Sequence, residues 1–92
     1  EIAETGLFEL YQNEPNQYHK DCIIKYRLPD ASDVKLTRDD VTGKVIRIYE
    51  LQGQKGMNSI KLLQQELNTT GVLYYQLDAS NHTATKRMVV IE

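Results

Sequence analysis

The sequence predicts an all-β fold in which two antiparallel sheets form a sandwich. The first observation is that apolar and polar residues alternate with a period of two along most of the chain, as in strands that bury one face. The second is that turn-forming residues recur at roughly regular intervals. These turns are expected at Pro15-Asn16, Pro29-Asp30, Thr42-Gly43, residues 53–56, residues 68–71 and Ser80-Asn81. Seven short strands at this spacing favour an immunoglobulin-like antiparallel β-sandwich.

The clearest strands are residues 21–28 and 71–79. In both segments every second side chain is apolar or aromatic, so each strand is expected to turn one face to the core. The residues expected on these inward faces are Cys22, Ile24, Tyr26, Leu28, Leu73, Tyr75, Leu77 and Ala79.

Five weaker strands are predicted at residues 7–13, 33–36, 44–51, 56–63 and 84–91. The inward face of residues 44–51 is ambiguous; for the other four, the inward-facing residues are expected to be Phe8, Leu10, Val34, Leu36, Ile60, Leu62, Met88 and Val90. A helix competes near residues 59–68, because Ile60, Leu63 and Leu67 also have helical spacing. We favour a strand to Leu63 followed by about one helical turn over residues 64–67.

Composition limits the functions to be expected. Residues 1–92 suit a single domain, and 11 basic against 13 acidic side chains form no charge block of the kind that binds nucleic acid. The single cysteine, Cys22, excludes an intrachain disulfide. No apolar run reaches the ~20 residues that span a bilayer. The chain begins at Glu1 without an export signal, so we expect a piece from one end of a longer protein, without a transmembrane segment.

Two adjacent carboxylates, Asp39 and Asp40, are the first candidates for a chemical site. Neighbouring side chains on an extended strand point to opposite faces, so these two are expected to diverge, and acid-base or cation chemistry is not expected. The other candidates, His19 and Cys22 with His82 far along the chain, are too few for a zinc site and lack a group that would activate the thiol. No catalytic residue, metal or cofactor is therefore expected.

A sugar-binding or other ligand-binding sandwich would be expected to show aromatic platforms. The chain has no Trp, and Tyr18, Tyr49 and Tyr74 are the candidates for exposed rings. Isolated surface tyrosines are the simpler interpretation. The alternative function that these rings keep open is an accessory immunoglobulin-like sandwich, which binds a ligand or packs against a catalytic domain of the same parent protein.

Six segments, taken in order, carry a family resemblance over nearly the whole chain. They are LYQNEPN, IIKYRLPDASDVKLT, DVTGKVI, GQKGMNSI, GVLYYQLDA and TATKRMVVIE. In order and spacing they resemble the C-terminal sorting domain (type A) of proteins exported by the bacterial type IX secretion system. The resemblance implies an immunoglobulin-like β-sandwich at the end of a parent protein of the Bacteroidetes type.

Several residues match the turns and strand starts of that family. They are Pro15, Asn16, Asp40, Gly43, Lys44 and Gly71. The resemblance makes each of them part of a structural connection. Two neighbouring positions depart from the pattern, because Gln17 stands where the family usually has a proline and Leu73 where it has a tyrosine.

The last strand matches the family in a basic pair that precedes an apolar run. The candidates for recognition of the signal are therefore Lys86, Arg87, Met88, Val89 and Val90. Recognition by addition of a strand to a free sheet edge is physically plausible, and the last strand is the expected edge.

The strand at residues 33–36 departs from the family where it ends. Arg38 and Asp39 stand where the family usually has an aliphatic and an aromatic residue. Because burying either charge without a partner would cost several kcal/mol, we expect the strand to stop near Thr37 and to leave both side chains exposed.

The resemblance implies a non-catalytic export and sorting signal that is recognised in folded form. The implied partners are the outer-membrane secretion machinery with its sortase and the parent's upstream domain, with no nucleic acid among them. The implied destination is the cell surface or the medium of a Gram-negative bacterium, reached through the periplasm. Removal of the domain after export and attachment of the parent to surface lipopolysaccharide are further family expectations.

Overall fold

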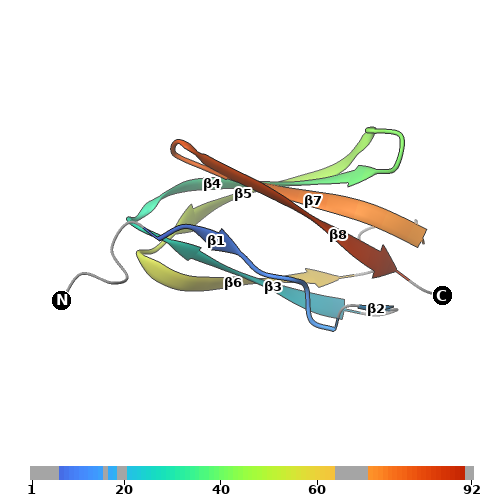
Figure 1. Ribbon diagram of the computed structural model, residues 1–92, viewed down its shortest axis with the longest axis horizontal. Coiled ribbons are helices and arrows are strands. Elements are labelled where there is room, and N and C mark those ends of the chain that lie inside the picture. The colour runs from blue at the N-terminus through green and yellow to red at the C-terminus, as the bar shows by residue number, and fades with distance from the viewer. Residues whose placement is uncertain (1–6, 16, 19–20, 64–70, 91–92) are drawn as a thin grey trace.

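The computed structural model describes residues 7–15, 17–18, 21–63 and 71–90, and these residues form two stacked β-sheets (Figure 1). One sheet has the strand order β1-β3-β6, with β1 at Glu9–Leu10, β3 at Asp21–Leu28 and β6 at Gly56–Leu63. The other has the order β2-β8-β7-β4-β5, with β2 at Gln17–Tyr18, β8 at His82–Val90, β7 at Gly71–Ala79, β4 at Ser32–Asp40 and β5 at Val45–Gly53. The predicted all-β, immunoglobulin-like sandwich is therefore confirmed.

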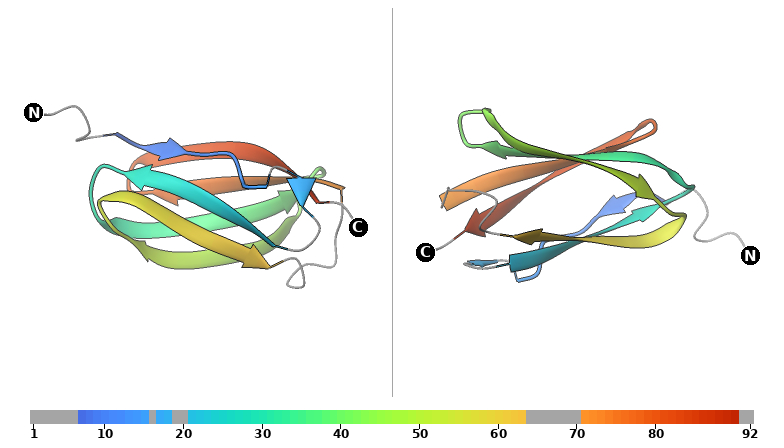
Figure 2. Two further views of the ribbon diagram at one scale, coloured as in Figure 1. Left: turned by 90° about the horizontal axis from the view of Figure 1, so that it is seen from below. Right: turned by 180° about the vertical axis from the view of Figure 1, so that it is seen from behind.

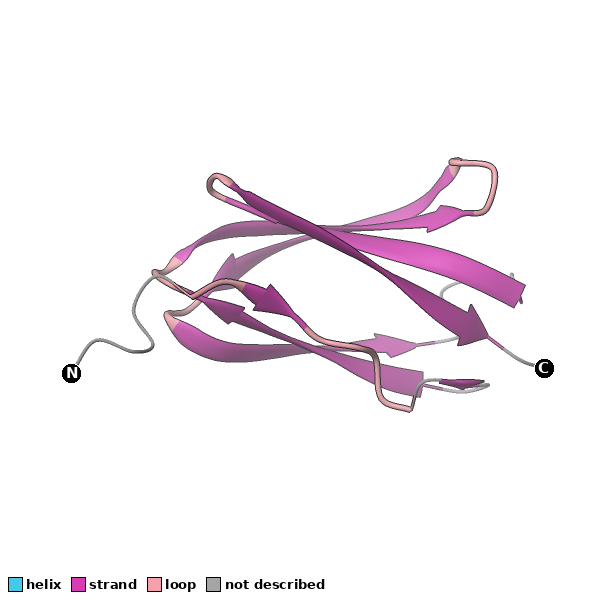
Figure 3. Ribbon diagram, in the orientation of Figure 1, coloured by secondary structure: helices cyan, strands magenta, loops and turns pink. Residues whose placement is uncertain are grey.

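All seven predicted strands are present, and the described residues form strands and loops without a helix (Figure 3). The bounds of β3 and β7 are those predicted. The first strand is shorter than expected, and the helical turn expected over residues 64–67 lies outside the described residues. One strand was not predicted: the two-residue β2 runs parallel to the end of β8, with Gln17 opposite Val89.

Figure 2 shows the two layers from below and from behind, and their inward faces enclose one hydrophobic core. Period-two alternation places these side chains inside, and each fully buried leucine, isoleucine or valine stabilises the fold by about 1.5–3 kcal/mol. The buried core consists of Leu10, Cys22, Ile24, Tyr26, Leu28, Val34, Leu36, Leu62, Leu73, Tyr75, Leu77, Ala79, Met88 and Val90. Every inward-facing residue predicted for β3 and β7 belongs to it, as do Met88 and Val90 of β8.

Strand β5, whose inward face the sequence left ambiguous, lies at an edge of the five-stranded sheet, where it pairs with β4. A bulge opposite Arg38 and Asp39 shifts its register, so that Ile46 packs against the core while Val45 faces outward. At its other end Gly53 lets the chain cross to the three-stranded sheet. A Cβ on this glycine would come within 2.9 Å of Cγ2 of Val34 and closer still to Cδ1 of Leu28, so a larger residue here would force these two core side chains to shift.

Candidate functional site

The last strand, β8, pairs with β7 in antiparallel register from His82 to Val90. Its opposite side is partly covered at the C-terminal end. There β2 pairs with Val89 and Val90, and Nε2 of Gln12 donates a hydrogen bond of 2.6 Å to the carbonyl of Arg87. Among the described residues, the edge of β8 that was predicted to be free is therefore open to another strand only over the earlier part of β8.

The five candidates for signal recognition divide between the two faces of β8. Met88 and Val90 have 0% and 1% of their surface exposed and belong to the core. Arg87 is exposed and Val89 half-buried on the outer face, whereas Lys86 is half-buried on the inward face. A partner that binds the folded chain can therefore contact Arg87, Val89 and part of Lys86, but not the side chains of Met88 and Val90.

Asp40 to Lys44 form the turn that joins β4 to β5. One carboxylate oxygen of Asp40 accepts hydrogen bonds from the hydroxyl of Thr42 at 2.6 Å, from its amide at 2.9 Å and from the Lys44 amide at 3.0 Å. These bonds lower the pKa of Asp40 below its ordinary value, and the bond from the Thr42 hydroxyl makes the largest contribution. Gly43 has a φ of 90°, which a glycine adopts without strain.

Two other motif residues, Pro15 and Gly71, lie at unusual backbone conformations. The Glu14–Pro15 peptide bond is cis, and the backbone of Glu14 exchanges two hydrogen bonds with Ile23, of 2.9 and 2.8 Å. Gly71 opens β7 with a φ of 103°. Asn16 lies outside the described residues.

The strand predicted at residues 33–36 corresponds to β4. The prediction that it stops near Thr37 is wrong, because β4 continues to Asp40 and pairs there with β7. The turn of the β4–β5 hairpin runs from Asp40 to Lys44. β4 therefore extends to Asp40, and β5 begins directly after the turn, at Val45. Arg38 consequently falls on the inward face and has 0% of its surface exposed. Its Nη2 donates a hydrogen bond of 3.1 Å to Sδ of Met88, so the guanidinium has a polar contact inside the core.

Asp39 is half-buried on the outer face of the same sheet, so it is less exposed than expected. It lies between Tyr74 of β7 and Val45 of β5 in the cross-strand register. Asp39 and Asp40 point to opposite faces, as predicted, and their carboxylates do not converge on a common site.

The cysteine and histidines form no site among the described residues. Cys22 is buried in the core near the start of β3, whereas His82 lies with Leu28 at the far end of that strand, about 20 Å away at the rise of an extended chain. The His82 ring stacks on Phe8 with centroids 4.8 Å apart. No three His, Cys, Asp or Glu side chains in the described segments are placed to hold a metal ion. His19 lies outside those segments.

Four large apolar side chains are exposed on the outer face of the five-stranded sheet, near the Asp40–Lys44 turn. We call them the apolar patch, and they are Val45, Ile48, Val72 and Tyr74. Sequence reasoning missed the patch, although residues 72–75, Val-Leu-Tyr-Tyr, signal it by being apolar or aromatic on both faces of one strand. Of the three tyrosines considered as platforms, Tyr74 is exposed, Tyr49 is half-buried under Arg47, and Tyr18 has no described side chain.

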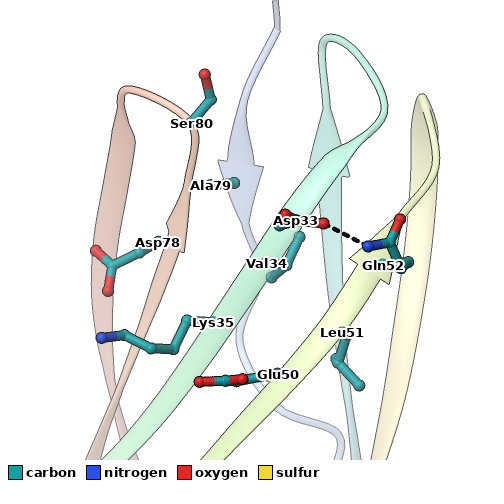
Figure 4. A pocket seen from close by; sticks show the side chains of 9 residues that line it. All are labelled: Asp33, Val34, Lys35, Glu50, Leu51, Gln52, Asp78, Ala79 and Ser80. Atoms are coloured by element: carbon teal, nitrogen blue, oxygen red, sulfur yellow. Dashed lines mark hydrogen bonds between the residues drawn. The ribbon is translucent and has the colours of Figure 1, made fainter.

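The other half of this outer face is polar and slightly hollowed (Figure 4). The concavity has a volume of about 480 Å³ and is open to solvent. Its charged and amide side chains come from β4, β5 and β7, and Figure 4 shows the hydrogen bond that Gln52 donates to Asp33. The polar lining comprises Asp33, Lys35, Glu50, Gln52, Asp78 and Ser80.

None of the segments with described structure forms a helix with the length and apolarity needed to cross a membrane.

Comparison with known proteins bears on the fold. No protein-family model matches the chain, and no curated protein matches it. A β-glucosidase from Erythrobacter marinus matches 92% of this chain and 15% of its own, with a TM-score of 0.55 and 12% identity. A β-glucosidase from Listeria innocua matches 91% of this chain and 16% of its own, with a TM-score of 0.50 and 14% identity. The chain thus spans about one sixth of these enzymes, and the likeness concerns the fold alone.

Proposed function

We propose that this chain is a C-terminal sorting domain that directs a parent protein across the outer membrane by type IX secretion. The observation that carries the proposal is the role of the residues shared with that family. Gly43 and Gly71 have positive φ, and Asp40 holds its turn through three hydrogen bonds, so the shared residues are those that shape the sandwich. Sequence resemblance and turn geometry thus support the same assignment.

The proposed signal is the surface of the folded domain, with Arg87 and Val89 of β8 as side chains that the secretion machinery contacts. Both lie on the outer face near the end of the described chain. A folded signal needs no reactive group, and the described residues bring together neither a metal site nor a nucleophile with a base. Removal by the sortase and attachment of the parent to lipopolysaccharide belong to the same proposal.

The experiment that tests this proposal fuses residues 1–92 to a fluorescent reporter with its own N-terminal leader, in a bacterium that has type IX secretion. We expect the reporter at the cell surface or in the medium, and loss of export when the last ten residues are removed. The same reporter without the domain is the control. Retention of the full fusion in the periplasm would count strongly against a sorting function.

A second candidate is an accessory sandwich of a larger enzyme. It is favoured by one observation, that two β-glucosidases contain a segment of this fold amounting to 15% and 16% of their length. In this case the polar concavity around Lys35 and Asp78 is the proposed ligand surface. Titration of the ¹⁵N-labelled chain with cellobiose, a β-glucoside, tests it. Shifts confined to the concavity would support this candidate, and unchanged spectra would count against it.

A further inference from the structure

Strand β5 leaves one side of the five-stranded sheet open to another strand. It stands last in the strand order, and among the described segments only β4 pairs with it. The bulge opposite Arg38 and Asp39 interrupts the ladder where β5 begins, so its regular part runs from Arg47 to Gly53. This part contains no proline, and a regular edge strand of that kind is a template for a further strand.

The turn between β4 and β5 determines which backbone groups of β5 face the open side. The Asp40 amide donates a hydrogen bond of 2.9 Å to the Lys44 carbonyl, so the even-numbered residues of β4 direct their N–H and C=O groups toward β5. Their partners on β5 are Tyr49 and the other odd-numbered residues of its regular part. The N–H and C=O groups of Ile48 and Glu50 therefore point away from β4, toward the open side.

The side chains of this edge suit a second copy of the same edge. On the outer face, Ile48 has 50% of its surface exposed, and on the inward face Tyr49 and Leu51 are half-buried. The guanidinium of Arg47 lies 5.3 Å from the centroid of the Tyr49 ring. The two charges of the edge, Arg47 and Glu50, have opposite signs, so two such edges carry no net repulsion, and pairing them removes apolar surface from water.

One antiparallel register makes the edge self-complementary. A two-fold axis normal to the sheet keeps each face on its own side, so inward-facing residues meet inward-facing residues. An axis at Glu50 would place two carboxylates directly opposite each other, which is unfavourable. An axis at Ile48 would leave only residues 47–49 for regular pairing before the bulge, and an axis at Leu51 would leave Ile48 uncovered. An axis at Tyr49 pairs residues 47–51 and avoids all three defects.

We propose that two copies of this chain associate through β5, antiparallel about a two-fold axis at Tyr49, so that their five-stranded sheets become one continuous sheet. The two Tyr49 rings meet at a non-hydrogen-bonded pair, where cross-strand side chains lie closest. Arg47 of each copy lies opposite Leu51 of the other, and Ile48 and Glu50 exchange backbone hydrogen bonds across the axis. A contact confined to one edge strand is small, so the dimer is weak and depends on concentration. It does not depend on the sorting function.

Disulfide trapping in the whole chain, with diamide as the oxidant, tests the register. Tyr49→Cys places two thiols on the axis and is expected to give a covalent dimer. Leu51→Cys, on the same face, holds its two thiols about 13 Å apart, beyond the reach of a disulfide, and is the matched control. Cys22 has only 2% of its surface exposed, so it does not compete in the folded chain. Trapping of Leu51→Cys as readily as Tyr49→Cys, or of neither variant, would overturn the proposal.

Edge prolines test the strand that pairs. Ile48→Pro removes an N–H that points to the open side, so the fold is expected to survive while association weakens by about tenfold or more. Ser59→Pro, in β6, is the matched control. Ser59 lies opposite Lys25, whose carbonyl accepts a hydrogen bond from the Tyr11 amide on the other side of β3, so the Ser59 N–H also points away from its neighbouring strand.

Sedimentation velocity between about 10 µM and about 1 mM measures the association of the unaltered chain and both proline variants. We expect the unaltered chain and Ser59→Pro to dimerise alike as concentration rises, and Ile48→Pro to remain largely monomeric. A monomer at every concentration in the unaltered chain, undiminished association in Ile48→Pro, or its loss in a folded Ser59→Pro would overturn the proposal.

Discussion

Arg38 and Met88 are in direct contact inside the sandwich: Nη2 of the guanidinium donates to Sδ at 3.1 Å, and neither side chain has any exposed surface. The contact joins β4 to β8 across the intervening β7. Because sulfur is a weak acceptor, this hydrogen bond by itself offsets little of the cost of removing a guanidinium from water. Arg38 thus lies where an apolar side chain of similar volume would also fit.

The first prediction concerns this position. Arg38→Ala is expected to lower the free energy of unfolding by about 3 kcal/mol, because it leaves a cavity in the core. Arg38→Leu refills most of that space with apolar atoms and is therefore expected to cost less than Arg38→Ala. Urea denaturation followed by tyrosine fluorescence measures both. Equal losses in the two variants would show that the guanidinium contacts matter more than the volume.

The second prediction concerns the Asp40 turn. Its hydrogen bonds lower the pKa of Asp40 in the folded state, so the stabilisation they confer is present above the unfolded pKa, near 3.9, and is lost as the pH falls through the folded value. Thr42→Val removes the largest contribution and is expected to move the pKa of Asp40 up toward its ordinary value. Carbon-13 NMR titration of the Asp40 carboxyl group measures the shift. An unchanged pKa in this variant would contradict the assigned cause.

The third prediction concerns Tyr75. Burial raises its pKa to about 12, and its hydroxyl donates to the carbonyl of Tyr11 at 2.8 Å. Because the folded pKa lies above the unfolded value near 10, this group favours folding below pH 10, and that contribution is lost as the pH rises toward 12. Tyr75→Phe is expected to reduce stability at neutral pH by about 1 kcal/mol and to weaken the alkaline loss. Denaturation between pH 7 and 11.5 is the measurement.

The fourth prediction concerns export. Arg87→Glu and Val89→Glu alter the outer face of β8 without entering the core, so we expect folded variants whose reporter fusions are exported poorly. Thr83→Glu, on the same face of the same strand but at its other end, is the matched control and is expected to be exported normally. Met88→Ala is expected to act differently, through a loss of stability of 2–5 kcal/mol, roughly that of other buried side chains. Normal export of both outer-face variants would exclude β8 as the recognised element.

Much of the architecture follows from alternation alone. β3 and β7 have the predicted bounds because every second residue is apolar or aromatic and a turn former follows each strand, Pro29-Asp30 after β3 and Ser80-Asn81 after β7. The end of β4 was predicted wrongly for a physical reason. Two charged residues suggested solvent, but the Asp40 turn fixes where the hairpin closes, and pairing with β5 and β7 then carries Arg38 into the core.

The remaining misses depend on contacts between distant segments. β2 has two residues and pairs with the end of β8, so no pattern in the local sequence predicts it. The row formed by Asp39, Tyr74 and Arg87 depends on the register of three strands, which composition does not specify. Residues 72–75 did carry a signal for the apolar patch, since successive side chains on both faces of that strand are apolar or aromatic.

The burial of Cys22 gives the molecule an intrinsic reporter of its own opening. It is the single cysteine of the chain, and only 2% of its surface is exposed at the start of β3. A thiol reagent therefore reacts when the two layers separate, at a rate set by how often they do so. The kinetics of such labelling would measure breathing of the native protein without any engineered probe.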